Sequence, residues 1–322
     1  MDLSYTQNLE DFHLTLAFAG QPTGFYIDVG GGHPVADNVT YWFYLRGWRG
    51  VTVEPQRALT DLHRRLRPRD AVFEGIVGRR SASVAFHEVE RFHGLSTTVE
   101  GFAKQAAALG TQVRTVHVPC LTLDDLCERE GVQEIDILKI DVEGAEGDVL
   151  AGIDLARRRP KVILAEAIEP GSGAPAWESW EPLLLAADYR FVLFDTLNRF
   201  YVAAEQAEIL GRFPRERAPW DSAVHMYEIG RAPDNPRHPE HRLARDLARG
   251  LWAELPRLDP SLVARLALLG RGGTVPDEAA AAALAAELDT DAGRARLGRI
   301  ACGYDGGQIV DGEEEQAAPP PA

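Results

Sequence analysis

Short apolar runs recur along the first two thirds of the chain, and the segments between them carry apolar residues at helical spacing. Such runs, bounded by glycine, proline or acidic residues, are typical of buried strands. The runs are FYIDVG (25–30), RGVTVEP (49–55), AVFEGIVG (71–78), SVAFHEV (83–89), IDILKID (135–141), KVILAEAI (161–168), RFVLFDT (190–196) and AVHMYEI (223–229). Strands that alternate with helices predict an α/β fold with a doubly wound sheet of about seven strands.

Two features of the pattern predict departures from a purely parallel sheet. The run at 83–89 has the character of an added antiparallel strand, and no long helix separates the runs at 190–196 and 223–229. Parallel neighbours need a long crossover connection, which is usually helical. We therefore expect the last strands to be antiparallel.

Helix signals fall between the runs. Val39, Trp42 and Phe43 share one helical face. Thr122 stands where a helix cap is expected, with Asp125 at the capping-box position.

The character of the chain changes after residue 230. A linker-like stretch is followed by a segment rich in Ala, Leu and Arg with helical period, and the last residues are acidic and proline-rich. The predicted divisions are an N-terminal segment (1–23), a main α/β domain (24–233), a helical extension (234–305) and a disordered tail (306–322). If the chain forms a homo-oligomer, we expect the contact to involve the helices of this extension.

Composition narrows the classes of partner. The net charge of −15, with 34 basic and 49 acidic residues among 322, argues against broad contact with nucleic acid. No run is long enough to span a membrane and the N-terminus lacks signal-peptide features, so we expect no membrane partner and a cytoplasmic location. The three cysteines have no metal-ligand spacing, which predicts reduced thiols and no bound metal.

The stretch FYIDVGGGHPVADN (25–38) predicts a ligand site, because ligands of a doubly wound sheet bind at the carboxyl ends of its strands. Gly30 and Gly32 let the backbone approach a ligand closely. Glu54 follows Asp28 by 54 − 28 = 26 residues, at the end of the next strand, where a carboxylate can accept both hydroxyls of an adenosine ribose.

The turn matches a dinucleotide fingerprint only in part. Val35 replaces the third glycine, and His33 and Pro34 interrupt the expected start of the helix. An adenosine that carries an amino acid in place of phosphates fits better, which indicates S-adenosylmethionine. Asp28 is then expected near its ammonium and His33 beside its methionine tail, while the turn amides are expected to bind its carboxylate. An NAD(P)-dependent oxidoreductase stays open as an alternative.

The stretch LKIDVEGAEGDVL (138–150) places several charges at the end of the most apolar strand. Charges at a buried strand end are costly unless they are paired or liganded. Capping of the following helix explains in part why Glu146 or Glu143 stands at this place. It does not account for Lys139 and Asp141, which alternate on an otherwise apolar strand.

These blocks, with GLSTT (94–98), VILAEAIEP and FDTLNRFYV, resemble in order and spacing the FkbM-type family of S-adenosylmethionine-dependent methyltransferases, over about residues 24–230. The resemblance implies a class I methyltransferase (Rossmann-like) fold and methylation of hydroxyl oxygens on sugars or secondary metabolites. It places Asp28, Gly30 and Gly32 at the cofactor turn, Glu54 at the ribose and Asp141 beside the transferred methyl. Many members have alanine and asparagine where this chain has Gly31 and Gly32, and the segment beyond 234 has no counterpart.

A hydroxyl acceptor needs a base within hydrogen-bond reach. We favour Asp141 or Glu143 and next His93, which has an equal interpretation as a surface histidine; Glu166 is a further candidate. Contacts to the acceptor are predicted for Ser96, Thr97, Glu166, Asn198 and Arg199. For Ser96 or Thr97 the alternative to an acceptor contact is helix capping. For Trp177, Trp180 and His225 the alternative to a role in the site is packing in the core. A non-catalytic scaffold that keeps this fold is the remaining alternative function.

Overall fold

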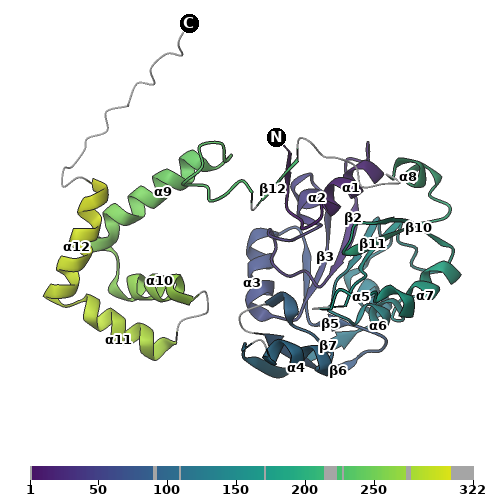
Figure 1. Ribbon diagram of the computed structural model, residues 1–322, viewed down its shortest axis with the longest axis horizontal. Helices are drawn as coiled ribbons and strands as arrows, with labels where there is room; N and C mark the ends of the chain where they lie inside the picture. Colours follow the sequence, from purple (N-terminus) through teal and green to yellow (C-terminus); the bar gives the residue numbers. More distant parts are fainter. Residues whose placement is uncertain are drawn as a thin grey trace, which may run out of the picture. The chain divides into compact units, whose positions relative to one another are not determined.

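The computed structural model divides into two compact units, Met1–Glu228 and Ile229–Ala322 (Figure 1). It describes residues 2–89, 93–108, 110–169, 172–213, 223–226, 228–272 and 277–305. The first unit includes the N-terminal segment that the sequence set apart, and its boundary lies close to the predicted end of the α/β domain.

A seven-stranded sheet forms the centre of the first unit. Its strands, in spatial order, are β10 (Tyr189–Phe194), β11 (Asn198–Ala203), β9 (Val162–Glu166), β8 (Ile137–Ile140), β2 (Phe25–Val29), β3 (Arg49–Glu54) and β4 (Ala71–Glu74). The pairs from β9 to β4 are all parallel, whereas β11 is antiparallel to both β9 and β10. The doubly wound α/β fold predicted from the sequence is confirmed.

Helices cover both faces of this sheet because its strands are apolar on both sides. On β9, Ile163 and Ala165 join one core cluster while Val162 and Leu164 join the other. The first cluster contains side chains of α5 (Leu123–Glu130), α6 (Glu146–Leu150) and α7 (Glu181–Ala186). The second contains side chains of α1 (Glu10–Ala17), α2 (Tyr41–Leu45) and α8 (Ala207–Arg212). Two-sided burial of this kind is typical of parallel sheets.

Helix α3 (Arg57–Leu66) connects β3 to β4, and Thr122 caps α5 as predicted, its hydroxyl accepting a hydrogen bond from the Asp125 amide at 3.0 Å. The remaining helical segments of this unit are η1 (His93–Leu95), α4 (Glu100–Ala108) and η2 (Trp177–Ser179). Trp180 is buried in the first core cluster and Trp177 packs against it, in agreement with the core-packing interpretation.

A smaller sheet lies beside the main one and corrects part of the strand prediction. Its strands are β5 (Ile76–Val77), β7 (Val113–Leu121) and β6 (Ala82–Val89). β6 is antiparallel to β7, so the added antiparallel strand is confirmed, but its partner β7 was missed. β7 was missed because exposed residues interrupt it, so it contains no continuous apolar run of the kind from which the other strands were predicted.

The prediction that residues 223–229 form the last strand of the main sheet is wrong. The described part of that run is β12 (Ala223–His225), which pairs in parallel with β1 (Asp2–Ser4) outside the main sheet. The antiparallel strand is β11, whose Phe200 and Val202 enter one core cluster and whose Tyr201 enters the other. Burial on both faces is what an inner strand needs.

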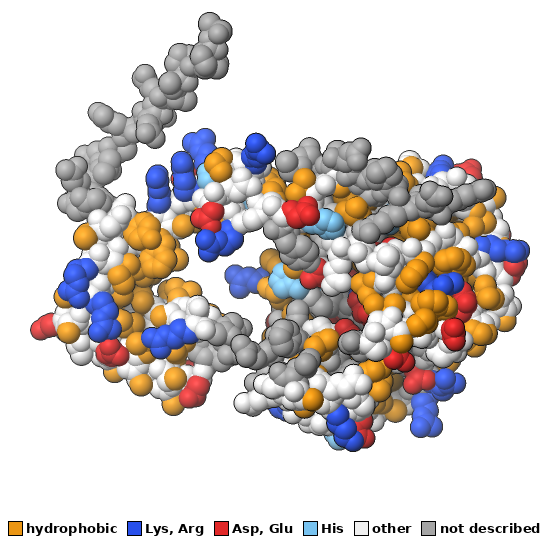
Figure 2. Space-filling model, in the orientation of Figure 1, with side chains coloured by type: hydrophobic (Ala, Val, Ile, Leu, Met, Phe, Trp, Pro, Cys, Tyr) orange, Lys and Arg blue, Asp and Glu red, His pale blue; other side chains and the backbone are white. Residues whose placement is uncertain are grey.

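The second unit consists of helices, as predicted. They are α9 (His241–Glu254), η3 (Leu255–Arg257), α10 (Pro260–Gly272), α11 (Glu278–Leu288) and α12 (Asp291–Asp305). Its core is small, and Figure 2 shows hydrophobic side chains on its surface. Leu243 and Leu247 are among the exposed residues of this unit. Among the described residues, no helix combines the length and the apolar character that crossing a membrane requires.

Candidate functional site

A cavity of about 980 Å³ opens at the carboxyl ends of β2, β3 and β8. The strand order reverses between β2 and β8, so the cavity lies at the topological switch point where ligands of such sheets bind. Predicted site residues that line it are Gly30, Gly32, His33, Glu54, Ser96, Asp141 and Glu143. One end of one sheet therefore gathers residues that lie up to 113 positions apart (143 − 30).

The glycine turn that follows β2 cannot accept side chains at two of its positions. A Cβ atom on Gly30 would lie 1.7 Å from the carbonyl oxygen of Asp141, and one on Gly31 would lie 2.2 Å from Cγ2 of Thr52. Gly32 has φ +51 and open space where its Cβ would stand. The first two glycines thus bring the turn against β3 and β8, and the third leaves its cavity side free for a ligand.

Hydrogen bonds within the protein occupy the backbone donors of this turn. The amides of Gly30 and Gly31 donate to the Val53 carbonyl, and the amide of Gly32 donates to Oε2 of Glu54 at 3.0 Å. The prediction that these amides bind the carboxylate of a ligand is therefore wrong for the turn as it stands. The same arrangement is poor for a pyrophosphate, which needs free amides at a helix N-terminus, and α2 begins only at Tyr41.

The carbonyls of the turn are held as well, each by a different side chain. Nζ of Lys139 donates to Gly30 O at 2.5 Å, Nδ2 of Asn38 donates to Gly31 O at 2.9 Å, and Nε2 of His63 lies 3.0 Å from Gly32 O. Because amides and carbonyls are both fixed, the turn presents a pre-organised surface to the cavity. His33 stabilises the loop that follows the glycines, because its Nδ1 accepts hydrogen bonds from the amides of Val35 and Ala36.

Asp28 does not face the cavity, which corrects its predicted place beside a ligand's ammonium. Alternation along β2 turns its side chain away from Ile27 and Val29, and the register pairs it with Lys139 on β8. The carboxylate is fully buried, lies 3.2 Å from Nζ of Lys139 and accepts from the Thr40 hydroxyl at 2.7 Å. Burial alone would raise its pKa, but the charges of Lys139 and Arg67 hold that pKa below its ordinary value.

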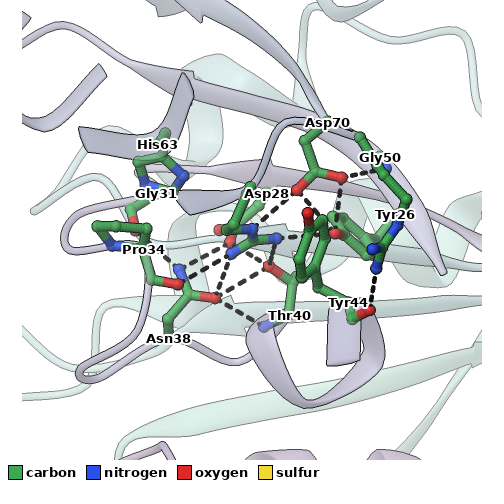
Figure 3. A network of polar contacts seen from close by, with 12 residues as sticks. Tyr26, Asp28, Gly31, Pro34, Asn38, Thr40, Tyr44, Gly50, His63 and Asp70 are labelled. Carbon is green, nitrogen blue, oxygen red and sulfur yellow. Dashed lines mark hydrogen bonds and ion pairs between the residues drawn. The ribbon is translucent and has the colours of Figure 1, made fainter. Parts of the chain in front are cut away.

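A buried arginine connects this strand to the loop that carries the turn. Arg67, at the end of α3, donates to Asp70 at 2.8 Å, to the Tyr26 hydroxyl at 2.8 Å and to Oδ1 of Asn38 at 2.9 Å. Figure 3 shows the hydrogen bonds that join these residues to Thr40. The sequence analysis missed this network. The available signal was the helical spacing of Thr60, His63 and Arg67, which places three polar residues on one face. All three are buried in the structure.

We expect Arg67→Met to lower the free energy of unfolding by about 3–5 kcal/mol, because it leaves Asp70 buried without its cation. Urea unfolding followed by tryptophan fluorescence measures the change. Arg57→Met on the same helix is the matched control, since its side chain is 83% exposed and its ion pair with Asp61 spans 3.9 Å. The control should change stability by less than about 0.5 kcal/mol. Equal effects of the two substitutions would contradict a structural role for the network.

Glu54 ends β3 at the rim of the cavity. Its Oε1 accepts from the Gln56 amide at 2.8 Å and its Oε2 from Gly32. Burial raises the pKa of Glu54 to about 7, against the lowering effect of these two amides. A carboxylate that is buried at a strand end and lines a cavity is suited to accept the hydroxyls of a polar ligand.

Three carboxylates meet where β8 and β9 end. Ile140 pairs with Ala165 in parallel register, so Asp141 and Glu166 leave the sheet side by side. Oxygen atoms of Asp141, Glu143 and Glu166 all lie within 4.8 Å of one another. Lys139 contacts this group, with Nζ 3.5 Å from Oδ2 of Asp141.

The backbone and the electrostatics of this group are both unusual. Glu143 has φ 54, a conformation rare outside glycine, and its carbonyl accepts the Thr97 hydroxyl at 2.8 Å. Burial, with Asp141 and Glu146 nearby, raises the pKa of Glu143 to about 8. Burial and the neighbouring carboxylates raise the pKa of Glu166 to about 11. Glu146, the first residue of α6, accepts from the amides of Val142 and Gly144 in the loop before the helix, and no described side chain caps the helix itself.

The hydroxyl groups of Ser96 and Thr97 in GLSTT form hydrogen bonds within the protein. Ser96 lines the cavity, but its oxygen accepts from the Val89 amide at 3.0 Å. Thr97 is buried and positions Glu143, so its predicted contact with an acceptor is replaced by a structural role. Thr98 lines the cavity. The side chain of His93 lies outside the described part of the chain.

Asn198 and Arg199 are held within the protein, which corrects their prediction as acceptor contacts. Asn198 is buried and donates to Oε1 of Glu10 at 2.8 Å. Arg199 donates to Oε1 of Glu181 at 2.7 Å and to the Tyr201 hydroxyl at 2.8 Å. Neither lines the cavity. Both belong to β11, which the sequence analysis did not identify as an inner strand.

The chain shows two similarities to known proteins. Residues 28–191 match the family model of the methyltransferase FkbM domain. A crystal structure of the O-methyltransferase from Bacillus cereus in complex with SAH aligns with a TM-score of 0.32 and 16% identity, over 62% of this chain and 82% of that one. A likeness this low carries no conclusion about ligand or reaction. No curated protein shows significant sequence similarity to the chain.

Proposed function

The chain belongs to the FkbM methyltransferase family, and from this we propose that it transfers a methyl group from S-adenosylmethionine to a hydroxyl oxygen of a sugar or another small metabolite. The observation that carries the proposal is the shared cavity, which has Glu54 on one side and Asp141 with Glu143 on another. A donor nucleoside and an acceptor hydroxyl thus have separate acidic residues to recognise them.

The residues of the cavity fit an adenosine that carries no phosphate. Glu54 supplies carboxylate oxygens for ribose hydroxyls, and Gly32 leaves open space above a turn whose amides are engaged. This engagement disfavours the NAD(P) alternative, because a pyrophosphate needs those amides. Val53 and Val77 form an apolar part of the cavity wall, which suits a purine ring.

The chemistry asks for alignment and for removal of one proton. S-adenosylmethionine, when bound, supplies a methyl group on a positively charged sulfur that leaves as a neutral thioether. The cavity walls must hold the acceptor oxygen in line with that methyl and exclude water, which can contribute about 7 kcal/mol or more. A carboxylate of Asp141 or Glu143 would accept the proton that the acceptor hydroxyl loses on methylation. Lys139 fixes Asp141 for this role.

Nucleoside affinity should depend on pH through Glu54, whose folded pKa is raised by burial to about 7. The charges that act on it are Lys139 and Asp28, with opposing effects. Below pH 7 the carboxyl is protonated and loses acceptor capacity, so the dissociation constant should rise towards about tenfold per pH unit. Above about pH 8 it should level off. Calorimetry with 5′-methylthioadenosine between pH 5.5 and 8.5 measures the profile, since that probe has no amino acid to titrate.

Glu54→Gln is the control for this profile. Its amide keeps the shape of the side chain and does not titrate, so the remaining affinity should be flat over the same pH range. A profile shared by the two proteins would assign the pH dependence to another group.

A further inference from the structure

The acidic group at the ends of β8 and β9 is larger than a single base requires. Asp141, Glu143 and Glu166 come from two adjacent strand ends and the loop between β8 and α6, and one oxygen of each lies within 4.8 Å of the others. Asp141 and Glu143 line the cavity, whereas Glu166, predicted as an acceptor contact, does not line it and is 9% exposed. Three convergent carboxylate oxygens are ligands of the kind that hard divalent cations prefer.

Glu166 supplies a second and independent observation. Its Oε2 is buried and accepts no hydrogen bond from any described residue. Buried carboxylate oxygens normally accept hydrogen bonds, because an unpartnered one loses its hydration without compensation. The orphaned oxygen belongs to the same side chain that converges on Asp141 and Glu143 and forms a carboxyl–carboxyl contact with Asp141, so this place requires either a proton or a cation.

Lys139 is a cation beside this group, but it does not neutralise the three carboxylates. Lys139 lies 3.2 Å from Asp28 and 3.5 Å from Asp141, so its charge is divided between them. Glu146 adds a further negative charge close to the group, although its Oε1 is occupied by two amides. Asp141 has a second oxygen besides the Oδ2 that Lys139 contacts.

We propose that Asp141, Glu143 and Glu166 bind one divalent cation of the oxygen-preferring class, Mg²⁺ or Mn²⁺, at the edge of the cavity. The role of this cation rests on the proposed function. Placed beside the acceptor, it lowers the pKa of a hydroxyl and leaves less work for a carboxylate base. Acceptors with two neighbouring oxygens, such as vicinal diols, suit such a site because both oxygens can reach the same ion. Prediction of a metal-free protein considered only cysteine ligands and did not anticipate this group.

Titration of the full chain with Mn²⁺ tests the site without cofactor or acceptor. After dialysis against a chelator, the electron paramagnetic resonance signal of free Mn²⁺ gives the bound fraction, and Mg²⁺ is then added as a competitor. We expect one ion per chain with a dissociation constant below about 1 mM. Glu166→Gln should weaken binding by at least about tenfold. Glu208→Gln, whose side chain is 85% exposed on α8, should leave it unchanged.

Absence of saturable Mn²⁺ binding, or equal binding by wild type and Glu166→Gln, would overturn the metal site. A proton shared between Glu166 and Asp141 would then be what relieves the repulsion. Glu166→Gln keeps the side-chain shape and replaces one ligand oxygen with an amide nitrogen, and circular dichroism checks its fold. If that variant does not fold, Glu143→Gln replaces it, with the same outcomes.

The metal site and the proposed function fail separately. Mn²⁺ binding without binding of S-adenosylmethionine overturns the methyl-transfer function and leaves the metal site standing. Binding and turnover of S-adenosylmethionine without any Mn²⁺ binding overturns the metal site and leaves the methyl-transfer function standing.

Discussion

Asp141→Asn is expected to lower kcat for methyl transfer by a factor of about 10²–10⁴, the range that removal of a positioned acid or base produces. Asparagine keeps the size of the side chain but cannot accept the acceptor's proton, and it gives up the ion pair with Lys139 at 3.5 Å. Affinity for S-adenosylmethionine should fall much less than kcat, because the proposed ribose contact is made by Glu54 and not by Asp141. The measurement is the initial rate of S-adenosylhomocysteine formation with a panel of sugar and diol acceptors.

Asp61→Asn is the matched control for this substitution. Asp61 lies on α3, its side chain is 60% exposed, and its ion pairs are with surface arginines. The rate of methyl transfer by the Asp61→Asn variant should stay within about twofold of wild type, because exposed ion pairs contribute little to stability. An unchanged rate in Asp141→Asn would remove Asp141 from the chemistry and leave Glu143 as the candidate base.

Glu54→Ala is expected to weaken binding of S-adenosylmethionine by about 100-fold. Two charge-assisted hydrogen bonds to the ribose hydroxyls are lost, which corresponds to about 3 kcal/mol. The fold should survive, because burial already disfavours the charged form of this side chain and raises its pKa to about 7. Isothermal titration calorimetry gives the affinity, and a thermal melt checks the fold.

Glu74→Ala provides the comparison for Glu54→Ala. Glu74 pairs in register with Glu54 at the end of the adjacent strand, but its side chain is 39% exposed and bonds to Arg64. Its substitution should change the affinity by less than about threefold. Equal affinities of wild type and Glu54→Ala would remove the ribose assignment.

The sequence was sufficient for the parts of the fold that local patterns determine. The apolar runs that became β2, β3, β8 and β9 are buried on both faces, and such runs can be recognised without knowledge of their neighbours. β11 was missed because NRFYV begins with two polar residues directly after a turn. Its inner position depends on pairing with β9 and on the Asn198 contact with Glu10, 188 residues away in sequence.

The candidate site shows the same limit. Asp141, Glu143 and Glu166 were each predicted as a candidate base near a strand end, but only the structure shows that their oxygens form one group. The direction in which Asp28 points could not be determined. Its side chain is held by Lys139, 111 positions further along the chain, and by Thr40, and only the folded register brings these partners together.

The central claim is that one cavity holds a phosphate-free adenosine between Glu54 and the carboxylates that follow β8. A crystal structure of the chain with S-adenosylhomocysteine tests it most directly. We expect the ribose hydroxyls within about 2.6–3.2 Å of the Glu54 carboxylate and the sulfur beside Asp141. A nucleoside bound away from both residues would contradict the account.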